Sequence, residues 1–359
     1  MVHRWISSAG PGPEGTALSD HPARRRPLVP GSTNRGTRAG HDPAEGPRQT
    51  RPLRVAVVLA SANRPDLLGE VVADLQRQTW RDFTLVLSVP DESSLPAGPL
   101  PEGTVVVHDR GLAAQRNAGL AAVPEATHVF CFDDDAVVRE DFLERAVLFF
   151  AAHPEVVALT GQVLLDGAAG DEIPRDEADQ ALAASSAAPP SGRWTPSREL
   201  YGCNFAFRAD AVGGERFDAR LPLYSWLEDH DFARRLMRHG ALAKVDDCVI
   251  VHRGVKSGGR MAHERLGYSQ VMNPAYLHHV GSFPLWLTVY ETLPRTTKNV
   301  VRAVRGPEAE WRRERVRGNA RAMGDVLRRR FTPERILDLP LSRDRRAGRL
   351  TPDSSGRPR

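Results

Sequence analysis

The sequence predicts an α/β fold in which a mostly parallel central sheet is flanked by helices and followed by a C-terminal helical extension. Short apolar runs alternate along the chain with segments whose apolar residues recur every three to four positions, the pattern of a parallel sheet with helices on both faces. The first run, residues 54–60, is continuously apolar after Arg54, as in a strand buried on both faces. Three aspartates follow the fourth run, and ligands bind at the carboxyl ends of such strands.

Each element follows from a local pattern. The predicted strands are residues 54–60, 83–89, 104–108, 127–132, 156–164, 204–209 and 248–252. The predicted helices are residues 67–75, 112–122, 227–239, 283–304 and 307–331. The first helix is predicted because its apolar residues share one face, and Gly240 ends the third. Residues 166–198, rich in Ala, Ser, Pro, Gly and acids, predict a long loop.

Charge divides the chain into regions, although the formal net charge is only +4. Residues 53–294 carry 22 basic and 33 acidic groups, a net −11, whereas residues 295–330 carry 12 basic and 4 acidic groups, a net +8. Such an acidic body argues against a nucleic-acid partner. We expect disordered Pro-, Gly- and Arg-rich tails over residues 1–52 and 340–359, a folded domain over 53–275, and a basic helical extension over 276–339.

The composition also predicts the compartment. No run approaches the length of a membrane-spanning helix, and the first residues lack the apolar stretch of a signal peptide. Cys131, Cys203 and Cys248 are far apart in the sequence and form neither a disulfide framework nor a metal-binding pair. We expect them to be reduced core residues of a cytoplasmic protein.

The aspartate triplet is the first candidate for chemistry. Backbone alternation places Asp133 and Asp135 on one side of the strand and Asp134 on the other. Two carboxylates on one side suit a hard cation such as Mg²⁺ or Mn²⁺, with phosphate oxygens completing its shell. The alternative is an acidic turn that caps the following helix.

A second acidic cluster contains Glu228 and Asp229 and follows two aromatic residues, Tyr224 and Trp226. Aromatic rings beside carboxylates are typical of a sugar-binding floor with a general base. The alternative is helix capping, because acids at a helix N-terminus are favoured by the helix dipole.

Six segments, in this order, resemble glycosyltransferase family 2, whose inverting members have the GT-A (nucleotide-diphospho-sugar transferase) fold. They are VAVVLASANRPDLLGEVVADLQRQTW from Val55, FTLVLSVPDES from Phe83, GLAAQRNAGLAAV from Gly111, HVFCFDDDAVV from His128, YGCNFAFRADAV from Tyr201 and LYSWLEDHDFARRLMRHG from Leu223. The resemblance covers residues 54–255 and implies that residues 53–275 are a GT-A catalytic domain. The stretch from Tyr268 to Tyr276 is similar to a segment of rhamnosyltransferase-like members.

The resemblance implies a role for each matching residue. For the nucleotide, it implies that Asn63 and Arg64 line the first loop, that Asp91 accepts a hydrogen bond from the base, and that Arg116 and Asn117 lie nearby. For the metal, it implies that Asp133 and Asp134 face the ribose and metal and that Asp135 ligates the metal. Asp229 is the catalytic base with Glu228 beside it, and Asn204 lies on the acceptor side with Tyr224 and Trp226. His252 occupies the place of a late metal-binding histidine, or is a strand-end histidine bonded to backbone. Only Asp91 stands where the family has a run of aspartates.

These roles imply a metal-dependent inverting glycosyltransferase that moves a sugar from a nucleotide-sugar to a hydroxyl of a glycan, a lipid-linked molecule or a small molecule, as in cell envelope polysaccharide biosynthesis. Two alternatives remain. A sugar-phosphate nucleotidylyltransferase would need a Gly-rich first loop, which the sequence around Asn63 lacks. A non-catalytic nucleotide-sugar-binding protein would not need the intact aspartates Asp133, Asp135 and Asp229.

The basic extension allows two interpretations. Phe283, Leu285, Trp286, Leu287, Val289 and Tyr290 form an apolar patch, followed by Arg295, Lys298, Arg302 and Arg305. A basic amphipathic helix of this kind can lie on an anionic membrane, which predicts peripheral contact with the inner face of the membrane through residues 280–330. The alternative is a helix packed on the domain with a solvated basic face.

Overall fold

The computed structural model describes residues 52–340, apart from residues 169, 188 and 256–261. The tails predicted over residues 1–52 and 340–359 therefore lie, except for their innermost residues, outside the described part of the chain.

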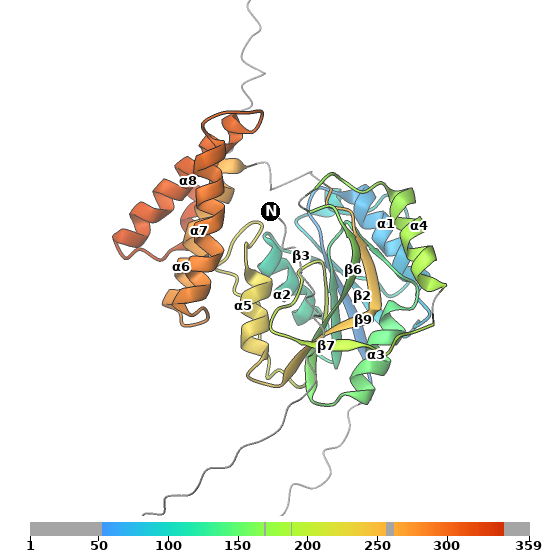
Figure 1. The fold of residues 1–359 in the computed structure, drawn as a ribbon. Helices are drawn as coiled ribbons and strands as arrows, with labels where there is room; N and C mark the ends of the chain where they lie inside the picture. Colours follow the sequence, from blue (N-terminus) through green and yellow to red (C-terminus); the bar gives the residue numbers. More distant parts are fainter. Residues whose placement is uncertain (1–51, 169, 188, 256–261, 341–359) are drawn as a thin grey trace, which may run out of the picture. The chain divides into compact units, whose positions relative to one another are not determined.

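A nine-stranded sheet forms the centre of the fold (Figure 1). Its strands are β1 (Val55–Ala60), β2 (Phe83–Val89), β3 (Val105–His108), β4 (His128–Phe132), β5 (Ala136–Val138), β6 (Val156–Asp166), β7 (Trp194–Ser197), β8 (Asn204–Arg208) and β9 (Ala241–His252). The strand order is β3-β2-β1-β4-β8-β6-β9-β5, with β7 also paired to β9. The strands β3, β2, β1 and β4 are parallel, whereas β8, β5 and β7 run antiparallel to their neighbours. The predicted mostly parallel sheet is confirmed.

Helices cover both faces of the sheet. They are α1 (Pro65–Gln76), α2 (Leu112–Ala122), α3 (Phe142–Ala152), α4 (Arg175–Ser186) and α5 (Glu228–Leu236), with a short 3₁₀ turn η1 (Glu92–Ser94). Alternate residues of β1 point to opposite faces, where one set packs with α1 and α3 and the other with α2 and α5. Both cores are apolar, so the parallel strands are buried on both sides, as their continuous apolar sequence predicts.

The prediction of a long loop over residues 166–198 is wrong for about half of these residues. It contains α4 and β7. The helix buries only Ala178 and Leu182, so it has almost no apolar stripe by which to recognise it. An ion pair between Arg175 and Asp179, one turn apart at 3.0 Å, supports it instead. All three cysteines are buried and free, which confirms the prediction of core thiols.

The C-terminal extension consists of α6 (His263–His279), α7 (Leu285–Arg302), α8 (Ala309–Leu327) and a 3₁₀ helix, η3 (Pro333–Asp338). The helices α6 and α8 approach so closely that a Cβ added at Gly318 would lie 2.0 Å from the carbonyl oxygen of Glu264. The predicted boundary between residues 275 and 276 falls inside α6. No helix in the described part of the chain is both long and apolar enough to span a bilayer.

Candidate active site

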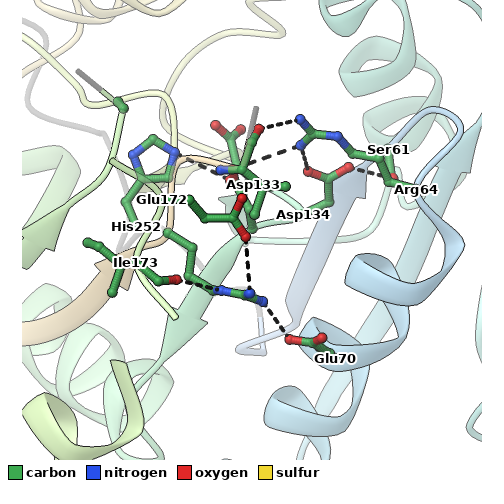
Figure 2. A network of polar contacts seen from close by, with 12 residues as sticks. Ser61, Arg64, Glu70, Asp133, Asp134, Glu172, Ile173 and His252 are labelled. Atoms are coloured by element: carbon green, nitrogen blue, oxygen red, sulfur yellow. Dashed lines mark hydrogen bonds and ion pairs between the residues drawn. The ribbon is translucent and has the colours of Figure 1, made fainter. Parts of the chain in front are cut away.

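The aspartate triplet forms a turn directly after β4, in which the N–H of Ala136 donates to the carbonyl of Asp133 at 3.2 Å. Arg64 lies 2.7 Å from Asp134 and 3.9 Å from Asp135. Figure 2 shows Ser61 and Arg64 pointing toward Asp134, whereas His252 lies on the side of Asp133. Ser61 donates to Asp134 at 2.6 Å, and Arg64 donates to its other oxygen at 2.7 Å. The carboxylate of Asp134 therefore ties the loop after β1 to the end of β4.

Asp133, Asp135 and His252 converge on the opposite side. Each offers one ligand atom, and these three atoms lie within 4.8 Å of one another. His252 ends β9, and its Nε2 lies 3.3 Å from the Oδ1 of Asp135. The other oxygen of Asp135 accepts a hydrogen bond from the backbone N–H of Val255 at 2.9 Å. His252 thus contacts carboxylates, which decides against the alternative of a histidine bonded only to backbone.

The pKa values of Asp133, Asp135 and His252 are shifted in different directions. Burial raises the pKa of Asp133 to about 6, opposed by Arg116 and reinforced by the negative charge of Asp135. Burial also acts to raise the pKa of Asp135, but the hydrogen bond and charge of His252, the charge of Arg64 and the N–H of Val255 together hold that pKa below its usual value. For His252, burial acts to lower the pKa, yet its hydrogen bonds to carboxylates raise it to about 10.

Two residues that the sequence analysis missed complete this group. Asp166, at the end of β6, accepts from the Nδ1 of His252 at 2.9 Å. The hydroxyl of Tyr201 donates to the second oxygen of Asp166 at 2.5 Å. With Nδ1–H held by a carboxylate, Nε2 of the imidazole is the nitrogen that faces Asp135 and can bind a cation. The pairing of β6 with β9 places Asp166 opposite His252, and that register is not visible in a single sequence.

The end of β9 is fixed by the residue after His252. Arg253 is buried and donates to Glu70 of α1 at 2.8 Å and to the carbonyl of Ile173 at 3.1 Å, with Glu172 at 3.5 Å (Figure 2). These contacts come from two segments distant in sequence, so they fix the direction in which His252 leaves the strand.

The donor set fits a divalent cation. Two carboxylates suit Mg²⁺ or Mn²⁺, and an imidazole is compatible with Mn²⁺ and later transition metals. Burial, reinforced by the charge of Asp135, raises the pKa of Asp133. A bound cation would act in the opposite direction because it neutralises both carboxylates. The Nε2 proton of His252 would leave when that nitrogen binds a cation.

Arg116 joins this group to the second acidic cluster. Its guanidinium, on α2, is only 1 % exposed and contacts Asp133 at 3.2 Å, the carbonyl of Gly202 at 2.7 Å and the carboxylate of Glu228. The rings of Phe205 and Phe217 lie 5.1 and 5.5 Å from its Cζ, which adds cation–π attraction. Arg116 is therefore the centre of a buried ion network rather than a freely accessible nucleotide contact.

Glu228 and Asp229 are adjacent but lie in different surroundings. Glu228 is buried against Arg116, and its Oε2 has no hydrogen-bond partner. Burial raises its pKa to about 8, although Arg116 opposes the shift. Asp229 is half-buried, and its two oxygens accept from the backbone N–H groups of Gly202 at 3.0 Å and His230 at 2.9 Å. Of the two carboxylates, only Asp229 is open to an acceptor hydroxyl.

The aromatic residues lie on a strained segment that leads into α5. Leu223, Ser225 and Leu227 all have positive φ, at 61°, 50° and 73°, which costs free energy in residues with a Cβ. Hydrogen bonds offset that cost, because the carbonyl of Leu223 and the hydroxyl of Ser225 accept from the first two N–H groups of α2 at 2.9 and 3.2 Å. The intervening rings of Tyr224 and Trp226 stack with centroids 6.4 Å apart.

Two predicted site residues, Asn117 and Asn204, make hydrogen bonds within the fold. The amide of Asn117 binds both the N–H and the carbonyl of Phe217, each at 2.8 Å, so it fastens that segment rather than facing the aspartates. Asn204 is fully buried, and its Oδ1 accepts from the N–H of Gly161 at 2.6 Å and the hydroxyl of Thr160 at 3.0 Å. It joins β8 to β6 and does not reach an acceptor.

Two further residues from the nucleotide prediction lie on the loops after β1 and β2. Asn63 has a φ of 58°, and its N–H donates to Ser94 at 3.1 Å. Asp91 is about half exposed and accepts from Ser93 at 2.5 Å, with Arg110 at 3.5 Å. Their roles in nucleotide binding stay predictions.

The fold is similar to that of glycosyltransferases of GT-A fold. The family model described as Glycosyl transferase family 2 matches residues 56–212, from β1 to the segment after β8, including the aspartate triplet. No curated protein sequence matches the chain.

Solved structures with similar folds include two glycosyltransferases. The mannosyltransferase PcManGT from Pyrobaculum calidifontis, in complex with GDP-Man and Mn²⁺, is 17% identical, with a TM-score of 0.45, over 76% of this chain and 87% of that one. Residues 1–349 of TarS from S. aureus, in complex with UDP-GlcNAc, are 14% identical, with a TM-score of 0.47, over 79% of this chain and 83% of that one.

Proposed function

We propose that this glycosyltransferase is metal-dependent and inverting, and that it moves a sugar from a nucleotide-sugar to an acceptor hydroxyl. The observation that carries the proposal is the connection between its two acidic clusters. Arg116 contacts Asp133 in the first cluster and the carbonyl of Gly202, while the N–H of Gly202 holds Asp229 in the second. A charged donor group and a general base are thereby held at a fixed separation, which a displacement reaction needs.

Asp133, Asp135 and His252 would hold the cation, with Asp166 orienting the histidine. When bound, a divalent cation supplies positive charge that stabilises the diphosphate leaving group. The class of donor follows from the same chemistry, because a nucleoside diphosphate presents oxygens to such a cation.

Asp229 acts as the base. Its carboxylate is oriented by two backbone N–H groups and takes the proton of the acceptor hydroxyl as the oxygen attacks the sugar. The new glycosidic bond forms on the face opposite the departing diphosphate, so a single displacement inverts the anomeric carbon. Tyr224 and Trp226 offer apolar ring surface for the acceptor.

The test compares Asp229→Asn with Asp135→Ala, using release of nucleoside diphosphate as the activity measure and calorimetric binding of donor analogues with Mn²⁺. We expect Asp229→Asn to lose about 10²–10⁴-fold in transfer rate while binding the donor analogue normally. Asp135→Ala loses both transfer and metal-dependent binding. An exposed carboxylate on α4, changed in Asp176→Asn, is the matched control. Near-normal transfer by Asp229→Asn would reject the base assignment.

A further inference from the structure

The helix α7 presents its apolar side to solvent and its polar side to the protein. Its exposed large apolar residues are Leu285, Trp286, Val289, Tyr290, Leu293, Val300 and Val301, each at least 48 % exposed. Its buried residues are Leu287, Glu291 and Asn299. A helix at a protein surface normally has the opposite arrangement.

Hydrogen bonds on the inner side fix this orientation. The buried carboxylate of Glu291 pairs with Arg295 at 2.8 Å. Asn299 donates to Gln270 of α6 at 2.8 Å and accepts from Arg312 of α8 at 2.7 Å. The Glu291–Arg295 pair lies within α7 and would survive a rotation of the helix. Rotation of α7 to hide its apolar side would, however, separate Asn299 from Gln270 and Arg312 and leave buried polar groups unpaired, which costs free energy.

The exposed side forms one continuous stripe. Successive members are separated by one, three or seven positions, which keeps them on one side of the helix, and the exposed Thr297 lies in the longest gap. From Leu285 to Val301 the stripe is about 24 Å long at 1.5 Å per residue, and none of its members is charged. Single exposed apolar residues are ordinary, whereas a contiguous stripe of this kind marks an interaction surface.

The charge around the stripe identifies its partner. Residues 295–330 carry a net +8, and the exposed Arg302 and Arg305 directly follow the end of the stripe. Residues 53–294 carry a net −11, so an anionic surface attracts the extension and repels the body. Trp286 and Tyr290, at the other end of the stripe, are the side chains that favour the boundary between hydrocarbon and water.

We propose that α7 is a docking helix that lies in the surface of an anionic lipid bilayer, with its apolar stripe among the acyl chains and its terminal arginines at the headgroups. This arrangement replaces the solvated basic face that was the alternative expectation for residues 280–330. The inference does not depend on the proposed transfer reaction.

The experiment is flotation of the full chain with vesicles of phosphatidylcholine and phosphatidylglycerol, and with vesicles of phosphatidylcholine alone. We expect binding to the anionic vesicles, weaker binding to the neutral ones, and release by salt. Leu293→Glu places a charge in the middle of the stripe, and we expect it to lower the bound fraction tenfold or more. A tenfold loss corresponds to about 1.4 kcal/mol, which is no more than the free energy of burying one leucine side chain.

Leu148→Glu is the matched control, because Leu148 is a similarly exposed leucine on α3. Val301→Glu repeats the test at the other end of the stripe, and circular dichroism checks that each variant is folded. Failure of the wild-type chain to float, or equal losses in Leu148→Glu and Leu293→Glu, would overturn the proposal. So would a wild-type dimer that Leu293→Glu dissociates without any lipid binding, since the stripe would then join two copies of the chain.

Discussion

The two acidic clusters of the site balance their charge in different ways. In the first, His252 lies between Asp135 and Asp166, and its protonated imidazole is hydrogen-bonded on both nitrogens. In the second, Glu228 is buried against Arg116, with one carboxylate oxygen left without a partner. Hydrogen bonds therefore lower the pKa of Asp135, whereas burial raises that of Glu228. The same functional group is kept charged in one place and made costly to charge in the other.

The largest expected effect on stability comes from replacing Arg116, which pairs with Glu228 in the second cluster. Arg116→Met leaves the buried carboxylate of Glu228 without its counterion, and we expect the free energy of unfolding to fall by about 3–5 kcal/mol. Urea denaturation measures it. In the first cluster, Asp135→Asn leaves His252 paired with Asp166 and should cost less.

The control for this prediction removes both charges. The double variant Arg116→Met/Glu228→Gln should be more stable than Arg116→Met, because the buried group at position 228 can then no longer carry an unpaired charge, although Asp133 still lacks Arg116. Equal unfolding free energies for the two variants would mean that the pair has no special electrostatic role.

A smaller effect is expected from the residue that orients His252. Asp166→Asn removes the carboxylate behind the imidazole, and we expect Mn²⁺ affinity to fall by about 10–100-fold, measured by titration calorimetry or by the paramagnetic resonance of free Mn²⁺. Tyr201→Phe, which removes one hydrogen bond to Asp166, should cost less. The control Asp176→Asn should bind Mn²⁺ as the wild type does. An unchanged Mn²⁺ affinity in Asp166→Asn would contradict a positioning role for Asp166.

The last effect, small per pH unit, is a pH dependence of stability in the second cluster. Burial raises the pKa of Glu228 from 4.5 to about 8, so the folded protein binds this proton more tightly than the unfolded chain. The resulting stability is fully present below the unfolded pKa and is lost as pH rises through the folded one. The unfolding free energy of the wild type relative to Glu228→Gln should therefore fall by at most about 1.4 kcal/mol per pH unit between about pH 5 and 8. A difference in unfolding free energy between the wild type and Glu228→Gln that stays constant with pH would disprove the raised pKa of Glu228.

The sequence predicted the elements that have a strong local pattern. The strands β1 to β4 and the helix α2 match their predicted ranges within a residue or so. The helix α3 was missed although its buried apolar residues repeat at helical spacing, so the signal was present. The helix α4 has almost no buried stripe, and α6 contains Pro274 and a mixed face; tertiary contacts define both of these.

The candidate site shows the same division. Strand alternation predicted that Asp133 and Asp135 share a side, and their ligand atoms do converge with His252. The triplet, however, forms a turn after β4, and Arg64 contacts both Asp134 and Asp135. Asp166 could not be predicted, because its position depends on a register shift between β6 and β9. The burial of Glu228 also depends on distant residues, and its local sequence does not distinguish it from Asp229.

The strained segment before α5 has a consequence for the order in which substrates bind. Its Leu223 and Ser225 hold the start of α2, and Arg116 lies four residues into that helix. In the proposed reaction, an acceptor that shifted Tyr224 or Trp226 would move the start of the helix that carries Arg116, which contacts Asp133. Donor and acceptor affinities would then be reciprocally linked, each substrate changing the affinity for the other by the same factor. We therefore expect donor and acceptor to bind cooperatively, because the eleven-residue helix α2 connects the two parts of the site.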